Sequence, residues 1–478
     1  MENTNREGFG SNFGFIMAAV GSAVGLGNIW GFPYKMGLNG GFAFLLIYLV
    51  LAAFVGLAVM VGELAIGRST GMSPIAAYRK ISKKFTWLGY MAVIAPFIIL
   101  CFYMVLGGMV MRYACSYLLA MFGVDIWGVK DISTFFGTFL LDGTQMIIWT
   151  AVFIAINTII VCGGIGGGIE KFCNIGMPCL FVMLIVIIVY VAVQPGAMGG
   201  YQFMFGLNIE PLKENFIGVL KTAAGQMFFS LSLGMGAIIT YGSYLSKKES
   251  IQKNAVIVVI MDTLVAIMAG MIVMPACYAF LDGNTTGGPG LLFASMQMVF
   301  HNMGGFIGNL MGFLFYFLVF IAAISSSMSL LEAITATKID SDIAKGKAPK
   351  RRATALVFAI LVLIFCMPTA LDGLGSGTAG GAWLPTPGEL FGIENPSGWS
   401  ADWLDFYDML SEGIIMPLGA MIMAFAIGWI WKIDMVKEEI EASGHKMWGK
   451  AFFAACYKFI TPIGMIIVLY GQITAYFG

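Results

Sequence analysis

The chain is divided into eleven apolar runs, each long enough to cross a lipid bilayer, which takes about 20 helical residues. Hydrophobic residues make up 59% of the sequence and charged residues only 11%, whereas an ordinary soluble domain is about a quarter charged. The sequence therefore predicts an all-α polytopic membrane protein with eleven transmembrane spans. The runs lie near residues 13–37, 41–66, 88–122, 144–162, 173–195, 217–245, 254–281, 305–336, 353–370, 405–431 and 451–476.

Basic residues are concentrated in alternate segments between the runs, for example around residues 79–84 and 345–352. The positive-inside rule places these segments and the N-terminus in the cytoplasm, and an odd number of spans then places the C-terminus outside. The start, MENTNREGFG, lacks the apolar core and cleavage site of a removable signal peptide. We expect a multi-pass protein of the cell membrane.

Glycine-rich stretches interrupt two of the runs at the depth of the bilayer. The first run contains GSAVGLGN at 21–28, and the sixth contains FSLSLGMGA at 229–237. Two interruptions five spans apart are typical of two five-span halves of inverted topology, each with one broken helix. This predicts a single transporter domain over 1–478, with repeats at 11–195 and 217–433 and an eleventh span at 447–478.

The interruptions are costly unless the opened backbone is used. A helix-interior glycine costs about 1 kcal/mol relative to alanine, and an unpaired amide in hydrocarbon costs several. The freed N–H groups attract anions and the freed carbonyls attract cations, so the breaks suit a small zwitterion and a companion cation. Close helix packing is the alternative, since Gly21 and Gly25 form a GxxxG pair. Packing would explain a single glycine-rich run. The sequence has two such runs, with Asn28 beside the first and hydroxyl side chains on the sixth and eighth runs, and this combination favours a binding site over packing.

Other kinds of site find little support in the sequence. The eight cysteines include no CxxC pair, and there are only two histidines, so a disulfide framework, a zinc site or histidine catalysis is not expected. No nucleophile and base form a recognisable pair, which argues against an enzyme, and no nucleic-acid partner is expected. A substrate-gated channel or receptor would need a continuous polar pore, and no selectivity-filter stretch is visible. The glycines of GGIGGGIE, 163–170, predict a flexible cytoplasmic turn.

Several stretches resemble the neurotransmitter:sodium symporter family, in its bacterial branch of LeuT-like and MhsT-like proteins. They are REGFGSNFGFIMAAVGSAVGLGNIWGFPY, GELAIGR, CFYMVLGG, FFSLSLGMGAIITYGSY, DTLVAIMAG and AAISSSMSLLE. The resemblance implies the LeuT fold and a sodium-coupled symporter that imports hydrophobic, including aromatic, L-amino acids by alternating access, with two sodium ions. The alternative is a sodium symporter for a different small amine or amino-acid derivative.

The resemblance also implies a set of binding residues. The first sodium site would use the Ala23 carbonyl with Asn28, Ser230 and Asp262. The second would use the carbonyls of Gly21, Val24 and Ala322 and the hydroxyls of Ser325 and Ser326. The amides of Leu26 and Gly27 and the hydroxyl of Tyr103 would hold the substrate carboxylate. The whole substrate-binding set is Ala23, Gly25, Leu26, Gly27, Ile99, Tyr103, Phe229, Ser230, Ser232, Met235, Ser326 and Leu330.

One departure from the family bears on chloride. Many relatives have Asn at the place of Asp262, and chloride-independent relatives typically carry a glutamate where this chain has Ala266. Asp262 supplies a fixed negative charge itself, so we expect chloride-independent transport.

The gates follow from the resemblance with a second departure. The inner gate would comprise Arg6, Phe9, Ser243, Tyr244, Glu332 and Asp340, with an ion pair between Arg6 and Asp340. For the outer gate, Asp408 fits the family's acid, but its arginine partner is replaced by Gly31. Lys35, one helical turn later, is expected to reach Asp408; alternatively, Phe229 and Tyr103 close the site without an ion pair. Glu63 is expected to pair with the unwound backbone.

Overall fold

The computed structural model describes residues 8–131, 134–285, 290–375, 384–442 and 444–477, and within these ranges the chain is helical with no β-strand. Short π-helical or 3-10 turns extend or join several helices. The helices are α1 (Asn12–Ala23), α2 (Phe32–Leu38), α3 (Phe42–Leu51), α4 (Leu57–Thr70), α5 (Pro74–Ile81), α6 (Thr86–Met121), α7 (Phe135–Leu141), α8 (Gly143–Cys162), α9 (Lys171–Ala192), α10 (Ala197–Phe205), α11 (Glu210–Ser230), α12 (Ala237–Tyr244), α13 (Ile251–Phe280), α14 (Met296–Met303), α15 (Gly305–Ala344), α16 (Arg351–Leu371), α17 (Pro387–Leu390), α18 (Trp403–Asp408), α19 (Met416–Phe425), α20 (Asp434–Glu441), α21 (Lys450–Ala455) and α22 (Thr461–Phe477). The short turns are η1 (Gly27–Gly31), η2 (Ala52–Gly56), η3 (Lys83–Phe85), η4 (Ile165–Glu170), η5 (Leu291–Ser295), η6 (Gly398–Ser400), η7 (Met409–Ile415), η8 (Ala426–Ile430) and η9 (Cys456–Ile460).

The apolar runs correspond closely to helical segments. Among the described residues, nine continuous segments are long and apolar enough to cross a membrane, and the bent pair formed by α1 with η1 and α2 adds a tenth. The sixth run forms α11 and α12, which are separated by the non-helical residues 231–236. The eleven-span count itself stays a prediction. The nine segments are Phe42–Thr70, Lys83–Met121, Gly143–Cys162, Ile165–Ala192, Ile251–Phe280, Gly305–Ala344, Arg351–Leu371, Trp403–Ile430 and Lys450–Phe477.

Local sequence explains where several helices begin and end. The N-cap side chains of Ser11, Asp142 and Ser250 accept hydrogen bonds from backbone amides in the first turns of α1, α8 and α13. Such caps satisfy amides that have no partner inside the helix. Helix α4 ends where Gly71 adopts a left-handed conformation, with φ of 64°, which glycine tolerates without a steric penalty.

The molecule buries polar side chains and exposes large apolar ones. Ile159 and Val193 are 72% and 74% exposed, whereas Asn28, Asp262 and Glu332 are fully buried. Ionisable groups inside a membrane protein face the interior of the bundle and mark functional sites. This distribution fits a protein surrounded by lipid with its functional groups at the centre.

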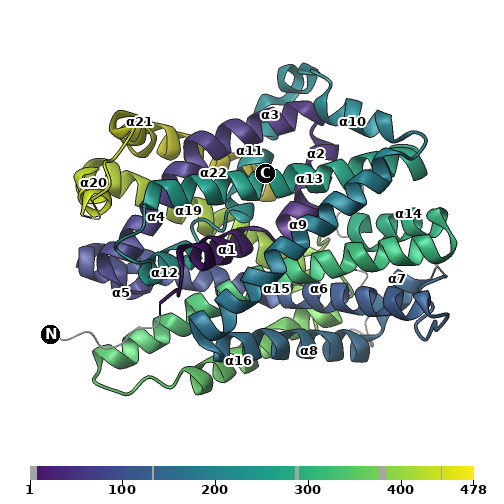
Figure 1. The fold of residues 1–478 in the computed structure, drawn as a ribbon, viewed down its shortest axis with the longest axis horizontal. Coiled ribbons are helices and arrows are strands. Elements are labelled where there is room, and N and C mark those ends of the chain that lie inside the picture. The colour runs from purple at the N-terminus through teal and green to yellow at the C-terminus, as the bar shows by residue number, and fades with distance from the viewer. Residues whose placement is uncertain (1–7, 132–133, 286–289, 376–383, 443, 478) are drawn as a thin grey trace.

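Helix α1 lies in the middle of the bundle, and the long helices α6 and α15 run side by side beneath it (Figure 1). Helices α5, α12 and α20 lie at one end of the molecule, and α7 and α14 lie at the opposite end (Figure 1). The first broken segment is thus surrounded by the other helices at the centre of the molecule.

The predicted turn at 163–170 is largely wrong. Residues 163 and 164 form the connection, but Ile165–Glu170 is the π-helical turn η4, which continues directly into α9. The Glu170 carboxylate accepts hydrogen bonds from the Gly10 amide at 2.8 Å and from the Ser11 hydroxyl at 3.1 Å. These contacts at the start of α1 give the glycine-rich stretch an ordered partner, which the local sequence does not reveal.

Candidate functional site

The first helix is broken at residues 24–26. Helix α1 ends at Ala23, Val24 adopts an extended conformation, and η1 begins at Gly27, with a bend of 51° between the two parts. A Cβ atom at Gly25 would lie 2.5 Å from the Ser326 hydroxyl oxygen and 2.6 Å from that of Tyr103. The glycine therefore lets side chains of α6 and α15 approach the opened backbone, as expected for a binding site.

The sixth helix is broken at residues 231–236. Ser232, Gly234 and Gly236 have positive φ angles there. The Gly234 amide donates to the Glu63 carboxylate at 2.7 Å, so the expected pairing of Glu63 with the unwound backbone is confirmed. Glu63 on α4 thereby satisfies one of the amides that the break exposes.

The two breaks face each other. The Ser232 hydroxyl donates to the main-chain oxygen of Ser22 at 2.8 Å, and a cavity lies between the broken segments. All the predicted substrate residues except Leu26 line this cavity, together with Ser22. The lining residues are Ser22, Ala23, Gly25, Gly27, Ile99, Tyr103, Phe229, Ser230, Ser232, Met235, Ser326 and Leu330.

The cavity has both polar and apolar residues in its lining. The Leu26 amide donates to the Tyr103 hydroxyl at 3.0 Å, and Leu26 precedes the first turn of η1, where amides lack helical partners. Ile99, Met235 and Leu330 supply an apolar wall. The free space is only about 20 Å³, so an amino acid has to displace side chains on entry, and the flexible Met235 is suited to that.

The predicted ligands of the first sodium site meet beside this cavity. The Asn28 side-chain amide donates to Asp262 Oδ1 at 2.7 Å. The Ser230 hydroxyl donates to both carboxylate oxygens of Asp262, at 3.1 and 2.9 Å. Tyr48, which the sequence did not single out, donates to Asp262 Oδ2 at 3.3 Å. Hydroxyl oxygens of α11 and α3 therefore lie beside one buried carboxylate, whereas Asn28 presents its side-chain nitrogen to that carboxylate and its side-chain oxygen to the Gly25 amide. Carboxylate and hydroxyl oxygens are the ligands that a hard cation prefers.

The predicted ligands of the second sodium site also lie together. The Ser326 hydroxyl donates to the carbonyls of Val24, at 3.0 Å, and Gly21, at 3.3 Å. The Ser325 hydroxyl donates to the Ala322 carbonyl at 3.0 Å and to that of Val24 at 3.5 Å. This cluster joins the end of α1 to α15 and contains no formal charge.

At the end of the molecule that holds α12, a polar cluster joins this half-helix to α15. The Tyr244 hydroxyl donates to Glu332 Oε1 at 2.8 Å. Glu332 also forms an ion pair with both terminal nitrogens of the Arg351 guanidinium, at 2.6 and 3.0 Å. Phe9 packs edge-on against Tyr241 and Tyr244.

The other predicted inner-gate residues have different surroundings. The Asp340 carboxylate accepts a hydrogen bond from the Ser73 amide at 2.6 Å. The Ser243 hydroxyl bonds to the Thr240 carbonyl of its own helix, at 2.6 Å. Arg6, the expected partner of Asp340, lies outside the described residues.

At the opposite end, Lys35 pairs with Glu412 rather than with Asp408 as expected. Lys35 Nζ lies 2.6 Å from Glu412 Oε1, and Glu412 is the more buried partner. Glu412 is four residues after Asp408, in η7, where the helix widens into a π-helical turn. A Cβ atom at Gly31 would lie 3.0 Å from the Gln226 side-chain oxygen, so a larger residue there would press against Gln226.

Comparisons with known proteins agree with this geometry. The model of the sodium:neurotransmitter symporter family matches residues 6–131 and 140–384. This chain belongs to that family. It is therefore a sodium-dependent symporter rather than an enzyme.

Relatives of the symporter cover nearly its whole length. It is 32% identical to the uncharacterized sodium-dependent transporter YhdH of Bacillus subtilis, over 96% of each chain. It is 31% identical to an uncharacterized sodium-dependent transporter of Haemophilus influenzae, over 98% of each chain. The crystal structure of MhsT in complex with L-phenylalanine superimposes with a TM-score of 0.84 at 34% identity, and the match covers 98% of the symporter and 100% of MhsT. The LeuT fold is therefore confirmed.

Sequence reasoning missed several polar residues around the symporter's centre. Gln226 donates to the Gly27 carbonyl at 2.7 Å, and its position one turn before Ser230 was an available signal. Glu412 was also missed, although an acidic residue inside an apolar run is a signal of the same kind. Tyr48 and Arg351 gave no comparable signal, because an aromatic residue in an apolar run and a basic residue at the end of such a run are both common in membrane proteins.

Proposed function

We propose that the symporter imports hydrophobic L-amino acids, aromatic ones included, together with two sodium ions by alternating access. The observation that supports this most is the cavity between the two breaks, which is lined by residues of both broken segments, by the hydroxyl-bearing Tyr103 and Ser326, and by apolar side chains. MhsT, a relative with the same fold, was crystallised with L-phenylalanine.

The two broken helices offer partners to both charges of an amino acid. The Leu26 amide and the Tyr103 hydroxyl lie at the start of η1, where the helix dipole favours a carboxylate. Ala23 lies at the carbonyl end of α1 and also lines the cavity, which favours the ammonium group. The side chain of the bound amino acid then points to Ile99, Met235 and Leu330, whose apolar surfaces select hydrophobic substrates.

The two clusters of oxygen atoms suit two sodium ions with different tasks. At the first, the carboxylate of Asp262 lies next to Ser230, which lines the cavity, so an ion there would lie between Asp262 and the substrate carboxylate and offset their repulsion. At the second, oxygens of α1 and α15 would share an ion, which would hold the two helices in one relative position. A tenfold gradient supplies about 1.4 kcal/mol per ion and 100 mV adds about 2.3 kcal/mol per charge, so two ions supply about 7 kcal/mol for accumulation.

The fixed charge of Asp262 makes a bound anion unnecessary. Its carboxylate is fully buried and hydrogen-bonded by Asn28, Ser230 and Tyr48. We therefore propose chloride-independent transport.

The two polar clusters at the ends of the molecule are the proposed gates. Tyr244, Glu332 and Arg351 belong to the inner gate and Lys35 and Glu412 to the outer gate. The charge distribution along the sequence supports a cytoplasmic N-terminus and an extracytoplasmic C-terminus. In this orientation the end with α5, α12 and α20 faces the cytoplasm. The repeats proposed for residues 11–195 and 217–433 would then each supply one broken helix.

Uptake into proteoliposomes tests this function. A panel of labelled amino acids and small amines is presented with an inward sodium gradient, with potassium in place of sodium, and with gluconate in place of chloride. We expect concentrative uptake of leucine-like and aromatic amino acids that needs sodium and persists in gluconate. Preferred uptake of an amine would indicate the alternative substrate class, and equal uptake in potassium would indicate a channel. A sharp fall in gluconate would refute chloride independence.

A further inference from the structure

Two apolar grooves lie on the outer surface of the molecule, on either side of the last turns of α8. The first lies between α8 and α16, which run side by side at one edge of the bundle (Figure 1). The second lies between the end of α8, η4, α9 and α15. Their volumes are about 520 and 500 Å³. Ile159 and Gly163 line both grooves, so the two adjoin at the end of α8.

The first groove has the length and polarity of one acyl chain. Residues of α8 from Ala151 to Cys162 line it, which is about 17 Å of helix at about 1.5 Å per residue. The hydrocarbon core of a bilayer is about 30 Å thick, so one leaflet is about 15 Å. Ala155 of α8 and Ala359 of α16 leave space beside larger side chains such as Ile360, which is 57% exposed. The groove therefore extends over about one leaflet.

The second groove gives a reason for the glycines of the stretch at 163–170. A Cβ atom at Gly168 would lie 2.0 Å from the Ile160 carbonyl oxygen, so this glycine lets η4 approach α8. Gly167 has no such constraint, because a Cβ atom there would have no atom within 4 Å and its φ angle is not positive. Gly167 lines the groove, so the lack of a side chain there keeps the groove open.

A basic residue lies at the same end of each groove. Arg352 lines the first groove and Lys171 lines the second. The start of α16 lies beside the end of α8, since the Cys162 sulfur is 3.9 Å from the Arg352 main-chain oxygen. Among the described residues no acidic side chain lines either groove. Glu170, next to Lys171 in sequence, instead accepts hydrogen bonds from the start of α1.

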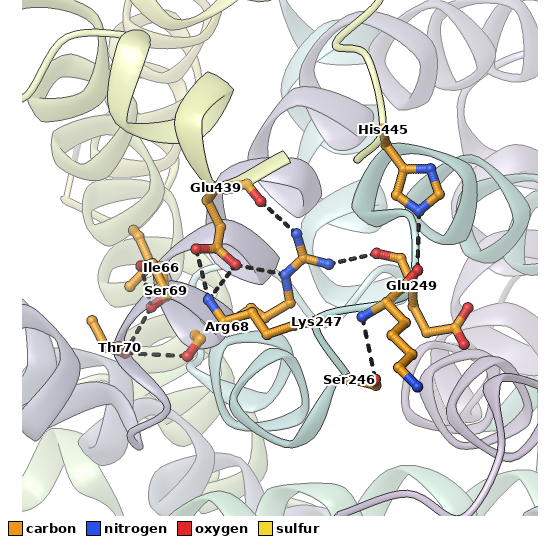
Figure 2. A network of polar contacts seen from close by, with 11 residues as sticks. Ile66, Arg68, Ser69, Thr70, Ser246, Lys247, Glu249, Glu439 and His445 are labelled. Carbon is orange, nitrogen blue, oxygen red and sulfur yellow. Dashed lines mark hydrogen bonds and ion pairs between the residues drawn. The ribbon is translucent and has the colours of Figure 1, made fainter. Parts of the chain in front are cut away.

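Other basic residues at this end of the molecule already have an acidic partner. Figure 2 shows Arg68 and Lys247 both bonded to the carboxylate of Glu439. Lys171 and Arg352 are exposed and form no ion pair within the part of the chain that the structure describes. Two positive charges beside apolar grooves are thus available to an anionic ligand.

We propose that the two grooves form a binding site for one anionic diacyl phospholipid. Its phosphate lies against Lys171 and Arg352, and each groove takes one acyl chain. Basic pockets between membrane helices bind anionic lipid head groups in this way, and in the orientation proposed above this end faces the negatively charged cytoplasmic leaflet. The bound lipid joins the starts of α9 and α16 to the end of α8. The inference does not depend on which substrate is transported.

Native mass spectrometry of the purified symporter gives the first test. Dioleoylphosphatidylglycerol and dioleoylphosphatidylcholine are added in separate samples, because they have the same chains but only the first has a net negative charge. We expect one phosphatidylglycerol to be retained at least fivefold more than phosphatidylcholine. Equal retention would show that the basic residues do not recognise the head group, and retention of a second protein chain in place of lipid would make the grooves a contact between copies. Either result would overturn the proposal.

Two further ligands separate the whole lipid from its parts. Single-chain lysophosphatidylglycerol should be retained at least fivefold less than the two-chain lipid, because it fills one groove only. Inorganic phosphate in excess should leave the retention of phosphatidylglycerol unchanged. Equal retention of the single-chain lipid, or displacement of phosphatidylglycerol by phosphate, would contradict a site for a diacyl phospholipid.

A variant that fills the second groove tests its role. Gly167→Leu places a side chain in the groove where the structure has free space, and we expect the retention of phosphatidylglycerol to fall at least fivefold. Gly464→Leu adds the same side chain in open space on α22 and should retain the lipid like the parent. Phosphatidylglycerol should raise the Tm of the parent by about 3 °C and that of Gly167→Leu by less than about 1 °C. Equal shifts or equal retention would contradict the proposal.

Variants without the two charges test recognition of the head group. Lys171→Gln combined with Arg352→Gln should remove the preference for phosphatidylglycerol over phosphatidylcholine. The matched control is Lys437→Gln combined with Lys450→Gln, which removes two basic residues from exposed ion pairs at the same end and should keep the preference. An unchanged preference in the first double variant would overturn the inference. Because these measurements involve no transport, their failure would leave the uptake test of the proposed function unaffected.

Discussion

Asn28 and Asp262 connect the first broken helix to α13 by two hydrogen bonds. The Asn28 side-chain amide donates to Asp262 Oδ1 at 2.7 Å and to the Asp262 main-chain oxygen at 3.1 Å. The Asn28 side-chain oxygen in turn accepts from the Gly25 amide at 3.0 Å. The break in α1 and the buried carboxylate are therefore connected by hydrogen bonds. A change at Asp262 should alter the binding of sodium at the first site and also the binding of the substrate.

Removing the charge of Asp262 should change the ion requirement of transport. Asp262→Asn keeps an oxygen atom for sodium but removes the negative charge beside it. We expect the sodium concentration for half-maximal uptake to rise at least tenfold, or about 1.4 kcal/mol, and chloride to stimulate the remaining uptake. Uptake by the variant with unchanged sodium dependence in gluconate would argue against this role.

The hydroxyls of Ser325 and Ser326 should set the affinity for the second sodium ion. Replacing either serine with alanine removes one oxygen at a cost of about 1 kcal/mol. We expect a roughly fivefold higher sodium requirement in flux assays. Ser327→Ala is the matched control, because Ser327 bonds to Asn157 rather than to α1, and its sodium requirement should not change. Equal effects at all three serines would point to general destabilisation instead.

Gly25 should tolerate no side chain. In Gly25→Ala the added methyl group would press against the hydroxyl oxygens of Ser326 and Tyr103, and overpacking of this kind costs about 1–3 kcal/mol. We expect binding of radiolabelled phenylalanine to weaken at least tenfold. Gly464→Ala, a change into open space on α22, should bind like the parent. Full binding by Gly25→Ala would mean that the substrate does not use this break.

The pair of Lys35 and Glu412 should contribute to closure of the outer gate. We expect Lys35→Ala and Glu412→Gln each to lower uptake several-fold, and the double variant to be no worse than either, because residues in contact are not additive. Lys213→Ala removes an exposed pair with Glu210 and serves as the control. If Asp408→Asn mimicked Lys35→Ala while Glu412→Gln had no effect, Asp408 would be the working partner. Unchanged uptake in all variants would favour closure by Phe229 and Tyr103 alone.

Features that depend on short stretches of the sequence were predictable. The positions of the helical segments followed from the lengths of the apolar runs, and the two breaks from glycines at bilayer depth. The ligands around Asp262 and Ser326 followed from a residue-by-residue resemblance, and the structure brings these residues together. Their binding roles remain predictions.

Features that depend on tertiary contact were not predictable. Lys35 was expected to reach Asp408 because the resemblance places the acid of the outer gate there, whereas the structure brings Lys35 to Glu412, four residues later in the π-helical turn η7. The glycines at 163–170 gave no sign that Glu170 would meet the start of α1. Likewise, nothing in the sequence near Glu439 indicates its buried ion pair with Arg68 of α4, which is 371 residues away along the chain.

The most direct measurement is equilibrium binding of labelled L-phenylalanine and L-leucine to the purified protein as sodium replaces potassium at constant ionic strength. We expect no specific binding in potassium alone and binding that rises with sodium with a Hill coefficient above one. Equal binding in potassium would contradict the claim that the two broken helices hold the amino acid and its cations together.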